Sequence, residues 1–310
     1  MENRHLLKLN DYTKEEIMEI LELGEQLKYE TKHGIAHDHL LRGKTLGMIF
    51  EKSSTRTRVS FEVGMYQLGG SALFLSSHDL QLGRGEPIKD TARVLSRYVD
   101  GIMIRTFSQK DVQDLAEYSK VPVINGLTDE EHPCQVLADL LTIKEFKRKF
   151  DGLKVAFIGD GNNMANSLMV GCLKVGMSIG IATPKGYEPP EHVIKAVKAV
   201  EEASKGIVTF ASNPEEVVKD ADVVITDVWT SMGQEEETIK RKEAFKGYQV
   251  NTDLMAIAKK DAMVLHCLPA HRGEEITEDI LELHAKEIFE EAENRLHAQK
   301  AVMVKLMQKN

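Results

Sequence analysis

Short apolar runs alternate with helix-like segments along most of the chain, and this alternation restricts the possible folds more than any other feature. A first series of strand-length runs covers 45–50, 71–75, 101–104 and 121–124. A second series covers 154–158, 178–182, 207–210, 223–226 and 263–266. Strands that alternate with helices form right-handed βαβ units in a mainly parallel sheet. The sequence therefore predicts an α/β protein with two open parallel sheets.

Helix signals frame the two series of strands. Thr13 and Glu16 have the spacing of a capping box and predict an opening helix. Helical patterns also cover 87–98, 109–119 and 133–147, and a closing helix is expected from about 285 to 307.

The length of the chain predicts two domains, because a single core rarely keeps growing beyond about 250–300 residues and this chain has 310. The charged run 144–149 follows a long amphipathic segment, and we place the junction there. We expect one domain over 1–148, a second over 149–286, and a C-terminal helix over 287–310 that packs back toward the first domain.

Composition excludes several classes of function. A formal charge of -9 argues against a nucleic-acid partner, which would demand a concentrated basic surface. No apolar stretch approaches the ~20 residues of a membrane span, and the polar N-terminus predicts a cytoplasmic protein. The cysteines are odd in number and in no metal-ligand spacing, so we expect neither a disulfide framework nor a metal site; they are Cys134, Cys172 and Cys267.

The loop Ser53-Ser54-Thr55-Arg56-Thr57 joins an apolar strand-length run to a helix-like segment. Hydroxyls, an arginine and the N–H groups of a helix N-terminus can converge there on one phosphate. The loop lacks the glycines and lysine of a P-loop, so it suits a single phosphoryl group better than ATP. An ordinary helix cap explains the Ser and Thr residues equally well.

Two further loops in the first half follow strands and carry polar side chains. Arg105 ends the run 101–104 and suits an anion, although surface arginines at strand ends are common. His132 and Gln135 flank Pro133, which is typical of the first turn of a helix. A neutral histidine there can donate to an oxygen and a glutamine can accept from an amide, although a lone loop histidine is more often plain surface.

The segment 159–165 partly matches a dinucleotide-binding fingerprint and raises a nicotinamide-dependent dehydrogenase as an alternative. The third glycine is missing, and the strand-length run 178–182 has no acid after it for a ribose hydroxyl. Asn162 and Asn163 offer amides that suit an amino acid better than a pyrophosphate.

The last two loops complete an inventory for an amino acid. Asp227 can pair with an ammonium group, and Ser231 with the Met232 backbone can hold a carboxylate. The alternative is an ordinary loop with a capping aspartate. This alternative is weakened because Trp229, the only tryptophan of the chain, lies in the same short segment. Cys267 directly follows the run 263–266. At a strand end it could act as a thiolate or as a hydrogen-bond partner.

Taken together, these loops resemble the aspartate/ornithine carbamoyltransferase family almost from end to end. Ser54–Thr57 and His132–Gln135 look like the family's carbamoyl phosphate motifs, and Gln81, Arg105 and Asn294-Arg295 fall on matching positions. The segments 231–233 and 266–269 look like the ornithine branch. The loop around Gln81 also lacks the lysine of the aspartate branch.

The resemblance implies the carbamoyltransferase fold, with two α/β domains joined by interdomain helices, and an ordered carbamoyl transfer to the δ-amine of ornithine without a cofactor. It implies that carbamoyl phosphate contacts Ser54, Thr55, Arg56, Thr57, Gln81, Arg105, His132, Gln135, Cys267, Leu268 and Arg295. It implies that ornithine contacts Asn163, Asp227, Ser231 and Met232. Catalytic roles are expected for Arg105, His132, Asp227 and Cys267.

The resemblance also implies partners and alternatives. Family members form homotrimers in which the loop around Gln81 reaches a neighbouring subunit, and the ornithine branch implies a role in arginine biosynthesis. Putrescine or N-acetylornithine is the alternative acceptor. A non-catalytic homologue would have lost catalytic side chains, which are present here.

Overall fold

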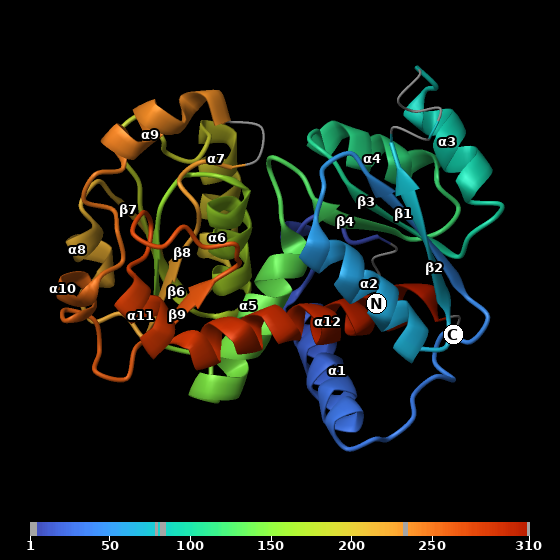
Figure 1. Ribbon diagram of the computed structural model, residues 1–310, viewed down its shortest axis with the longest axis horizontal. Helices are drawn as coiled ribbons and strands as arrows, with labels where there is room; N and C mark the ends of the chain where they lie inside the picture. The colour runs from blue at the N-terminus through green and yellow to red at the C-terminus, as the bar shows by residue number, and fades with distance from the viewer. Residues whose placement is uncertain (1–4, 78–79, 81–84, 232–234, 309–310) are drawn as a thin grey trace. The chain divides into compact units, whose positions relative to one another are not determined.

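The computed structural model describes residues 5–77, 80, 85–231 and 235–308. These residues form two compact units (Figure 1). Unit 1 comprises the chain up to Leu141 together with the segment from Glu293 onwards, and unit 2 comprises Thr142–Ala292. The helices α5 (Pro133–Lys147) and α12 (Ala285–Met307) each run from one unit into the other.

Unit 1 is built on a four-stranded parallel sheet with the order β2-β1-β3-β4. Its strands are β1 (Thr45–Phe50), β2 (Ser71–Ser76), β3 (Gly101–Arg105) and β4 (Val123–Leu127). The inner strands β1 and β3 are almost completely buried, whereas the edge strand β2 is largely accessible.

Helices cover both faces of this sheet because the chain reverses its direction across the sheet after β2. The helix α2 (Thr55–Gln67) lies on one face, and α3 (Ile88–Leu95) and α4 (Gln109–Tyr118) lie together on the other (Figure 1). The opening helix α1 (Lys14–Lys32) has the predicted capping box, since Thr13 Oγ1 accepts from Glu16 N–H and Glu16 Oε2 accepts from Thr13 N–H.

Unit 2 is built on a five-stranded parallel sheet with the order β7-β6-β5-β8-β9. The strands are β5 (Lys154–Ile158), β6 (Ser178–Ala182), β7 (Val208–Ala211), β8 (Val223–Thr226) and β9 (Met263–His266). The helices are α6 (Asn163–Val175), α7 (Glu191–Glu202), α8 (Pro214–Val218), α9 (Thr238–Ala244), α10 (Thr252–Met255) and α11 (Glu278–Leu283). Sequence patterning thus predicted most strands at their observed bounds.

The strand β4 is the largest departure from the prediction. The apolar run 121–124 predicted a strand that ends before Asn125, but the strand continues to Leu127. Asn125 is fully buried because its side-chain amide donates to Leu7 O and Gln109 Oε1. A polar residue with distant partners cannot be assigned to a strand from its local pattern.

Each sheet has one topological switch point, where the strand order reverses. In unit 1 it lies between β1 and β3, whose ends align with Phe50 opposite Arg105. In unit 2 it lies between β5 and β8, where Ile158 is opposite Thr226. Ligands of open α/β sheets bind at such points. Among the described residues, no helix is both long enough and apolar enough to cross a membrane.

Candidate functional site

The loop at residues 53–57 leads from β1 into α2 at the switch point of unit 1. Ser54 is the N-cap of α2, and its hydroxyl accepts from the backbone N–H of Thr57 at 3.1 Å. The helix-cap interpretation is therefore confirmed for Ser54. The first N–H groups of a helix have no acceptor within the helix, so the start of α2 still favours an anion.

Arg105 ends the neighbouring strand β3 and is 7% exposed. Its carbonyl oxygen accepts from the backbone N–H of Glu51, which fixes the two strand ends together. A buried guanidinium at the carboxyl end of a parallel strand excludes the surface-arginine alternative. The structure therefore places a permanent positive charge beside the switch point.

His132 precedes α5 and is 6% exposed. Burial lowers its pKa well below the ordinary value, and the nearby positive charges of Arg295, Arg105 and Arg56 lower the pKa further. The imidazole is therefore neutral at physiological pH, so it can donate one hydrogen bond without adding charge. Arg295, Arg105 and Arg56 are therefore near enough to this histidine to act on its charge.

Arg295, on α12, connects the helix starts of unit 1. Its Nη1 donates to Gln135 Oε1 at 2.7 Å and its Nη2 donates to Thr57 Oγ1 at 3.2 Å. Thr57, Gln135 and Arg295 are all nearly fully buried. The structure thus brings the predicted residues of α2, β3, α5 and α12 into one cationic cluster.

Two residues of this cluster were missed by the sequence analysis. Asp139 accepts from Gln135 Nε2 at 2.8 Å, one helical turn along α5. Gln299, with its amide oxygen turned toward Arg295, accepts from that guanidinium at 2.9 Å. Both are fully buried polar residues. Asp139 stands between the apolar positions of α5, which is a detectable signal, whereas nothing in the local pattern singles out Gln299.

The nearby Cys134 is structural. It is buried, its Sγ donates to Asn125 O at 3.4 Å, and burial raises the pKa of its thiol to about 12. A thiol of this kind stays protonated and is not a nucleophile.

In unit 2, the loop after β5 and the loop after β8 meet through an amide and a carboxylate. Asn162 caps α6, and its Nδ2 donates to Asp227 Oδ2 at 3.0 Å. Asp227 is 7% exposed and its Oδ1 also accepts from the backbone N–H of Val228. Asp227 is therefore held in one orientation at the switch point. Asn163 is the first residue of α6 and is half-buried.

Cys267 joins this arrangement from the neighbouring strand end. Its Sγ donates to Asp227 Oδ1 at 3.1 Å. His266 Nδ1 accepts from the backbone N–H of Leu268, so its Nε2 carries the proton and donates to Glu275 Oε1 at 3.1 Å. Leu268 has a left-handed backbone with φ of 57°. The histidine thus fixes the backbone that follows Cys267, a role that the sequence analysis did not assign.

The glycine pair at 159–161 has a packing explanation. A Cβ on Gly161 would lie 2.3 Å from the backbone nitrogen of Pro189 and 2.4 Å from the carbonyl carbon of Glu188. Beside it, Asp160 forms a buried ion pair with Arg241. Close backbone approach accounts for this glycine without a bound dinucleotide.

The remaining predicted residues are placed as follows. Thr55 is exposed and Arg56 is half-buried in the first turn of α2, and Ser231 is half-buried in the loop after β8. Gln81 and Met232 lie outside the described residues.

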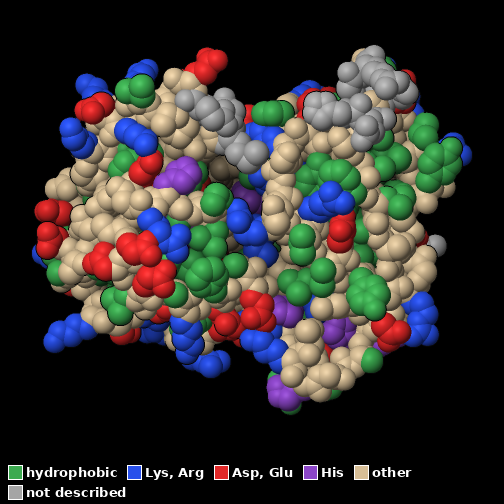
Figure 2. Space-filling model, viewed as in Figure 1, with side chains coloured by type: hydrophobic (Ala, Val, Ile, Leu, Met, Phe, Trp, Pro, Cys, Tyr) green, Lys and Arg blue, Asp and Glu red, His purple; other side chains and the backbone are tan. Residues whose placement is uncertain are grey.

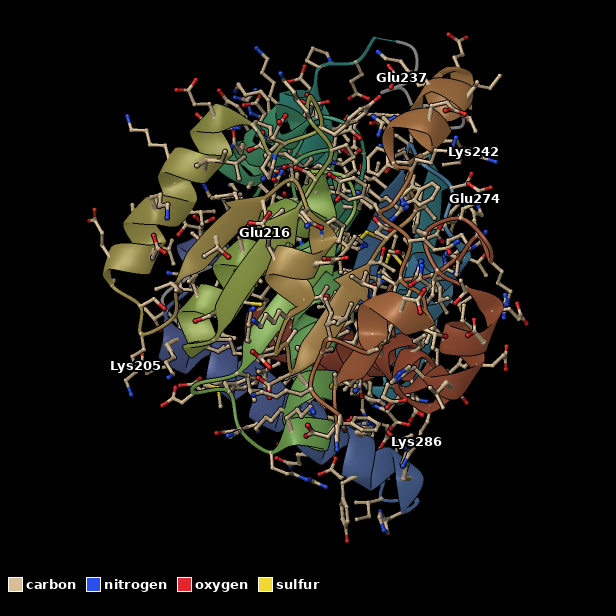
Figure 3. All side chains as sticks on the ribbon, turned by 90° about the vertical axis from the view of Figure 1, so that its left-hand side faces the viewer. Lys205, Glu216, Glu237, Lys242, Glu274 and Lys286 are labelled. Atoms are coloured by element: carbon tan, nitrogen blue, oxygen red, sulfur yellow. The ribbon has the colours of Figure 1, made fainter. Side chains whose placement is uncertain are left out.

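One group among the described residues has the composition of a metal site. Single ligand atoms of His271, Glu274 and Glu275 lie within 4.8 Å of one another. Glu274 already pairs with Lys242 at 2.7 Å (Figure 3), and Glu275 accepts from His266. The carboxylates of Glu274 and Glu275 therefore already have partners within the protein.

Comparisons with known proteins identify a family for both halves of the chain. Residues 4–145 match the carbamoyl-P binding domain of aspartate/ornithine carbamoyltransferases, and residues 151–306 match the Asp/Orn binding domain. An ornithine carbamoyltransferase of Anoxybacillus flavithermus is 58% identical over 307 residues, which cover 99% of this chain and 98% of that protein.

Solved structures of similar chains have the same fold. The ornithine carbamoyltransferase of Pyrococcus furiosus superposes with a TM-score of 0.94 at 56% identity, covering 98% of this chain and 97% of that chain. The anabolic enzyme of Campylobacter jejuni superposes with a TM-score of 0.92 at 47% identity, covering 98% and 99%.

Proposed function

The chain belongs to the aspartate/ornithine carbamoyltransferase family, and we propose that it transfers the carbamoyl group of carbamoyl phosphate to the δ-amine of L-ornithine. The products are L-citrulline and phosphate. The observation that carries the proposal is the cluster of Arg56, Arg105 and Arg295 around a neutral His132, because three positive charges suit a compact dianion.

We assign the phosphate to the start of α2. The backbone N–H groups of 54–57 and the guanidinium groups of Arg56 and Arg105 neutralise it, and Gln81 adds a further contact. Phosphate is a leaving group that needs charge stabilisation more than a proton.

We assign the carbamoyl group to the deeper part of the cluster. Thr57, Arg105 and His132 polarise its oxygen, and Gln135 accepts from its NH₂. The side chain of Arg295 and the carbonyl oxygen of Leu268 complete the carbamoyl contacts. Arg295 also holds Gln135 and Thr57 in place, as its two hydrogen bonds to them indicate.

We assign ornithine to the loops at the switch point of unit 2. Asp227 pairs with the α-ammonium group, while Asn163, Ser231 and the Met232 backbone hold the α-carboxylate. Cys267 lies near the δ-amine. The hydrogen bonds of Asp227 to Asn162 and Cys267 support this assignment, because they orient the carboxylate before any substrate arrives.

The chemical step forms one bond and breaks another. The lone pair of the neutral δ-amine attacks the carbamoyl carbon and gives a tetrahedral intermediate, and the bond from that carbon to the phosphate oxygen then breaks. The electron pair leaves with phosphate, and the proton of the attacking amine passes to the departing phosphate, so the products are a neutral ureido group and hydrogen phosphate. Carbamoyl phosphate binds first and ornithine second.

Product analysis tests this function directly. Purified protein given carbamoyl phosphate and ornithine is expected to form citrulline and phosphate in equal amounts, as measured by mass spectrometry and a phosphate assay. Phosphate release without a new ureido compound would mean that the protein only hydrolyses carbamoyl phosphate, and would contradict the proposal.

We further propose a homotrimer. Exposed apolar side chains gather on α2 and the edge strand β2 of unit 1, in the region where Figure 2 shows hydrophobic groups at the surface. They are Val59, Val63, Tyr66, Leu73 and Phe74. A sheet edge with apolar neighbours is a surface that soluble proteins usually cover, and closed rings of identical subunits are a common way to do so.

We place the enzyme in the cytoplasm and in arginine biosynthesis. None of the three cysteines forms a disulfide with another described residue, which is typical of proteins from reducing compartments.

The chemistry of the product supports the role in arginine biosynthesis. Citrulline carries the ureido carbon that a guanidino group requires, so a later reaction must replace the ureido oxygen with nitrogen.

A further inference from the structure

Gln299 lies one helical turn after Arg295 on α12 and is fully buried. Its amide oxygen accepts from Arg295 Nη2 at 2.9 Å and from Arg295 Nε at 3.2 Å. The opposite orientation of the amide would set its N–H groups against those of the guanidinium, so the oxygen faces Arg295. Two neighbouring N–H groups of the guanidinium are thus held by one oxygen, which restricts the rotation of the guanidinium.

The nitrogen of the Gln299 amide is anchored to α2. It donates to Ser60 Oγ, and the Ser60 hydroxyl donates to the backbone oxygen of Arg56 at 2.7 Å. The hydrogen bonds therefore run in one direction, from Arg295 through Gln299 and Ser60 to the backbone of α2. The amide cannot turn over without losing hydrogen bonds at both of its ends.

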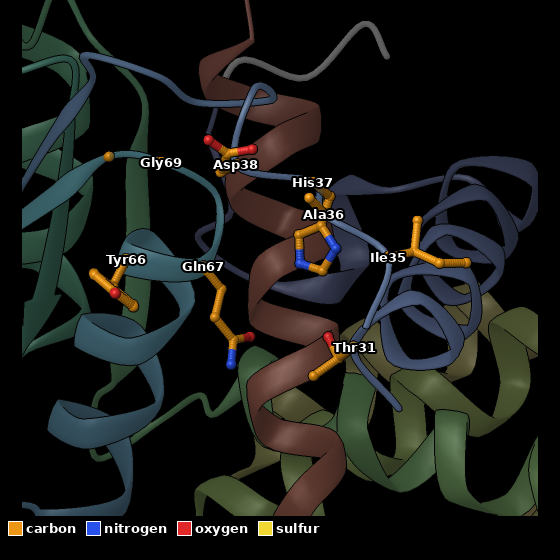
Figure 4. Close-up of a pocket in the computed structure, with 9 residues that line it drawn as sticks. Thr31, Ile35, Ala36, His37, Asp38, Tyr66, Gln67 and Gly69 are labelled. Carbon is orange, nitrogen blue, oxygen red and sulfur yellow. The ribbon is translucent and has the colours of Figure 1, made fainter. Parts of the chain in front are cut away.

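The contact between α2 and α12 continues further along the two helices. A Cβ on Gly64 would lie 2.9 Å from Met303 Cε, so the helices approach each other closely there. In the last turn of α2, Gln67 accepts from Lys300 Nζ at 2.9 Å, and Figure 4 shows this turn beside α12. These contacts hold α12 against α2 independently of Gln299.

The acceptors of the Arg295 guanidinium described above are neutral groups, namely the hydroxyl of Thr57 and the amides of Gln135 and Gln299. A neutral acceptor orients a guanidinium without offsetting its charge. The charge acts within the site, because after burial the charge of Arg295 is the largest cause that lowers the pKa of His132. A carboxylate in place of Gln299 would accept the same hydrogen bonds but would offset the charge of Arg295.

We propose that Gln299 is a positioning residue, which orients Arg295 toward the carbamoyl group and leaves the full positive charge of Arg295 available to carbamoyl phosphate. This inference rests on the proposed function, because the contact of Arg295 with the carbamoyl group belongs to that function. A charged donor that is held in place before the substrate arrives needs no reorganisation during the reaction.

Gln299→Glu separates the charge from the hydrogen bonds. Its carboxylate has the shape of the amide and can accept from both Arg295 and Ser60. The Kd for carbamoyl phosphate, measured by calorimetry without ornithine, is expected to rise by at least about tenfold, because the added negative charge offsets that of Arg295. Wild-type affinity in Gln299→Glu would overturn the proposal.

Met303→Ala is the matched control. Met303 is fully buried against Gly64, so its truncation loosens the contact between α2 and α12 without removing a partner of Arg295. This variant is expected to unfold at a lower temperature and to bind carbamoyl phosphate like wild type. An equal loss of affinity in Met303→Ala and Gln299→Glu would overturn the proposal, because looser helix packing would then explain both.

Gln299→Met keeps the test decisive if Gln299→Glu does not fold. This uncharged side chain has a similar length but no acceptor for Arg295, so the charge of Arg295 is retained and its orientation is not. We expect kcat for citrulline formation to fall by at least about tenfold, with a smaller change in the Kd for carbamoyl phosphate. Wild-type kcat in Gln299→Met would overturn the positioning role. Wild-type protein that forms no citrulline would contradict the proposed function, whereas the comparison of Kd values decides the role of Gln299 by itself.

Discussion

Arg56 is the residue whose removal tests the phosphate assignment most simply. Arg56→Ala deletes a charge at the start of α2, so KM for carbamoyl phosphate should rise by at least about tenfold, the cost of losing a hydrogen bond to a charged group. Arg58→Ala is the matched control, since Arg58 lies two residues further on and pairs with Glu62 at the surface. Wild-type affinity for carbamoyl phosphate in Arg56→Ala would contradict the assignment.

The pH dependence of the reaction should reflect the substrate amine. An alkylammonium group has a pKa near ~10.4 and only its neutral form attacks, so kcat/KM for ornithine should rise by up to about tenfold per pH unit above neutrality. The lowered pKa of His132 keeps its imidazole neutral throughout this range, so no titration of His132 lowers kcat/KM as the pH rises. Steady-state kinetics from neutral to mildly alkaline pH would check this, and a flat profile would count against it.

At this scale the sequence predicted the kinds of residues better than their partners. The hydroxyls at 54–57, Arg105, His132 and Asp227 all follow strands or precede helices, and parallel sheets bring such positions together. The roles of Asp139, Gln299 and Glu275 depend on contacts between residues far apart in the chain or in the fold. No spacing rule reveals such contacts in a single sequence.

At the scale of elements, strand lengths and helix starts were predictable because apolar runs and capping residues are local signals. The sheet order was not, because nothing in the sequence of β3 states on which side of β1 it pairs. That order creates the two switch points, and so it decides which loops become neighbours.

The loop after β5 offers a test at this scale. Gly161→Ala should lower the free energy of unfolding by about 1–3 kcal/mol, the usual cost of overpacking, because the new methyl group would meet the backbone of Glu188 and Pro189. In Gly47→Ala, the control, the added Cβ makes only ordinary contacts with Leu75 and Val99. Urea denaturation compares the two variants, and equal stability would show that the Gly161 loop can move away.

For the whole molecule, the proposed trimer predicts that subunits share sites. At a carbamoyl phosphate concentration at which Arg56→Ala and Gln81→Ala proteins are each inactive alone, random mixing should restore about a quarter of wild-type activity, because about one pair of neighbours in four then carries both intact residues. Gel filtration with light scattering verifies that the assemblies exchange subunits. If exchange occurs and no activity returns, Arg56 and Gln81 do not act together across a subunit boundary.

The central claim is that this chain carbamoylates ornithine in preference to related acceptors. The direct measurement is a colorimetric ureido assay of the purified protein with carbamoyl phosphate and, in separate reactions, ornithine, putrescine, N-acetylornithine or aspartate. We predict that kcat/KM for ornithine exceeds each of the others by at least about a hundredfold, since unpaired polar groups in a site built for an amino acid reject analogues strongly. A comparable or higher kcat/KM for any of the other three would contradict the account.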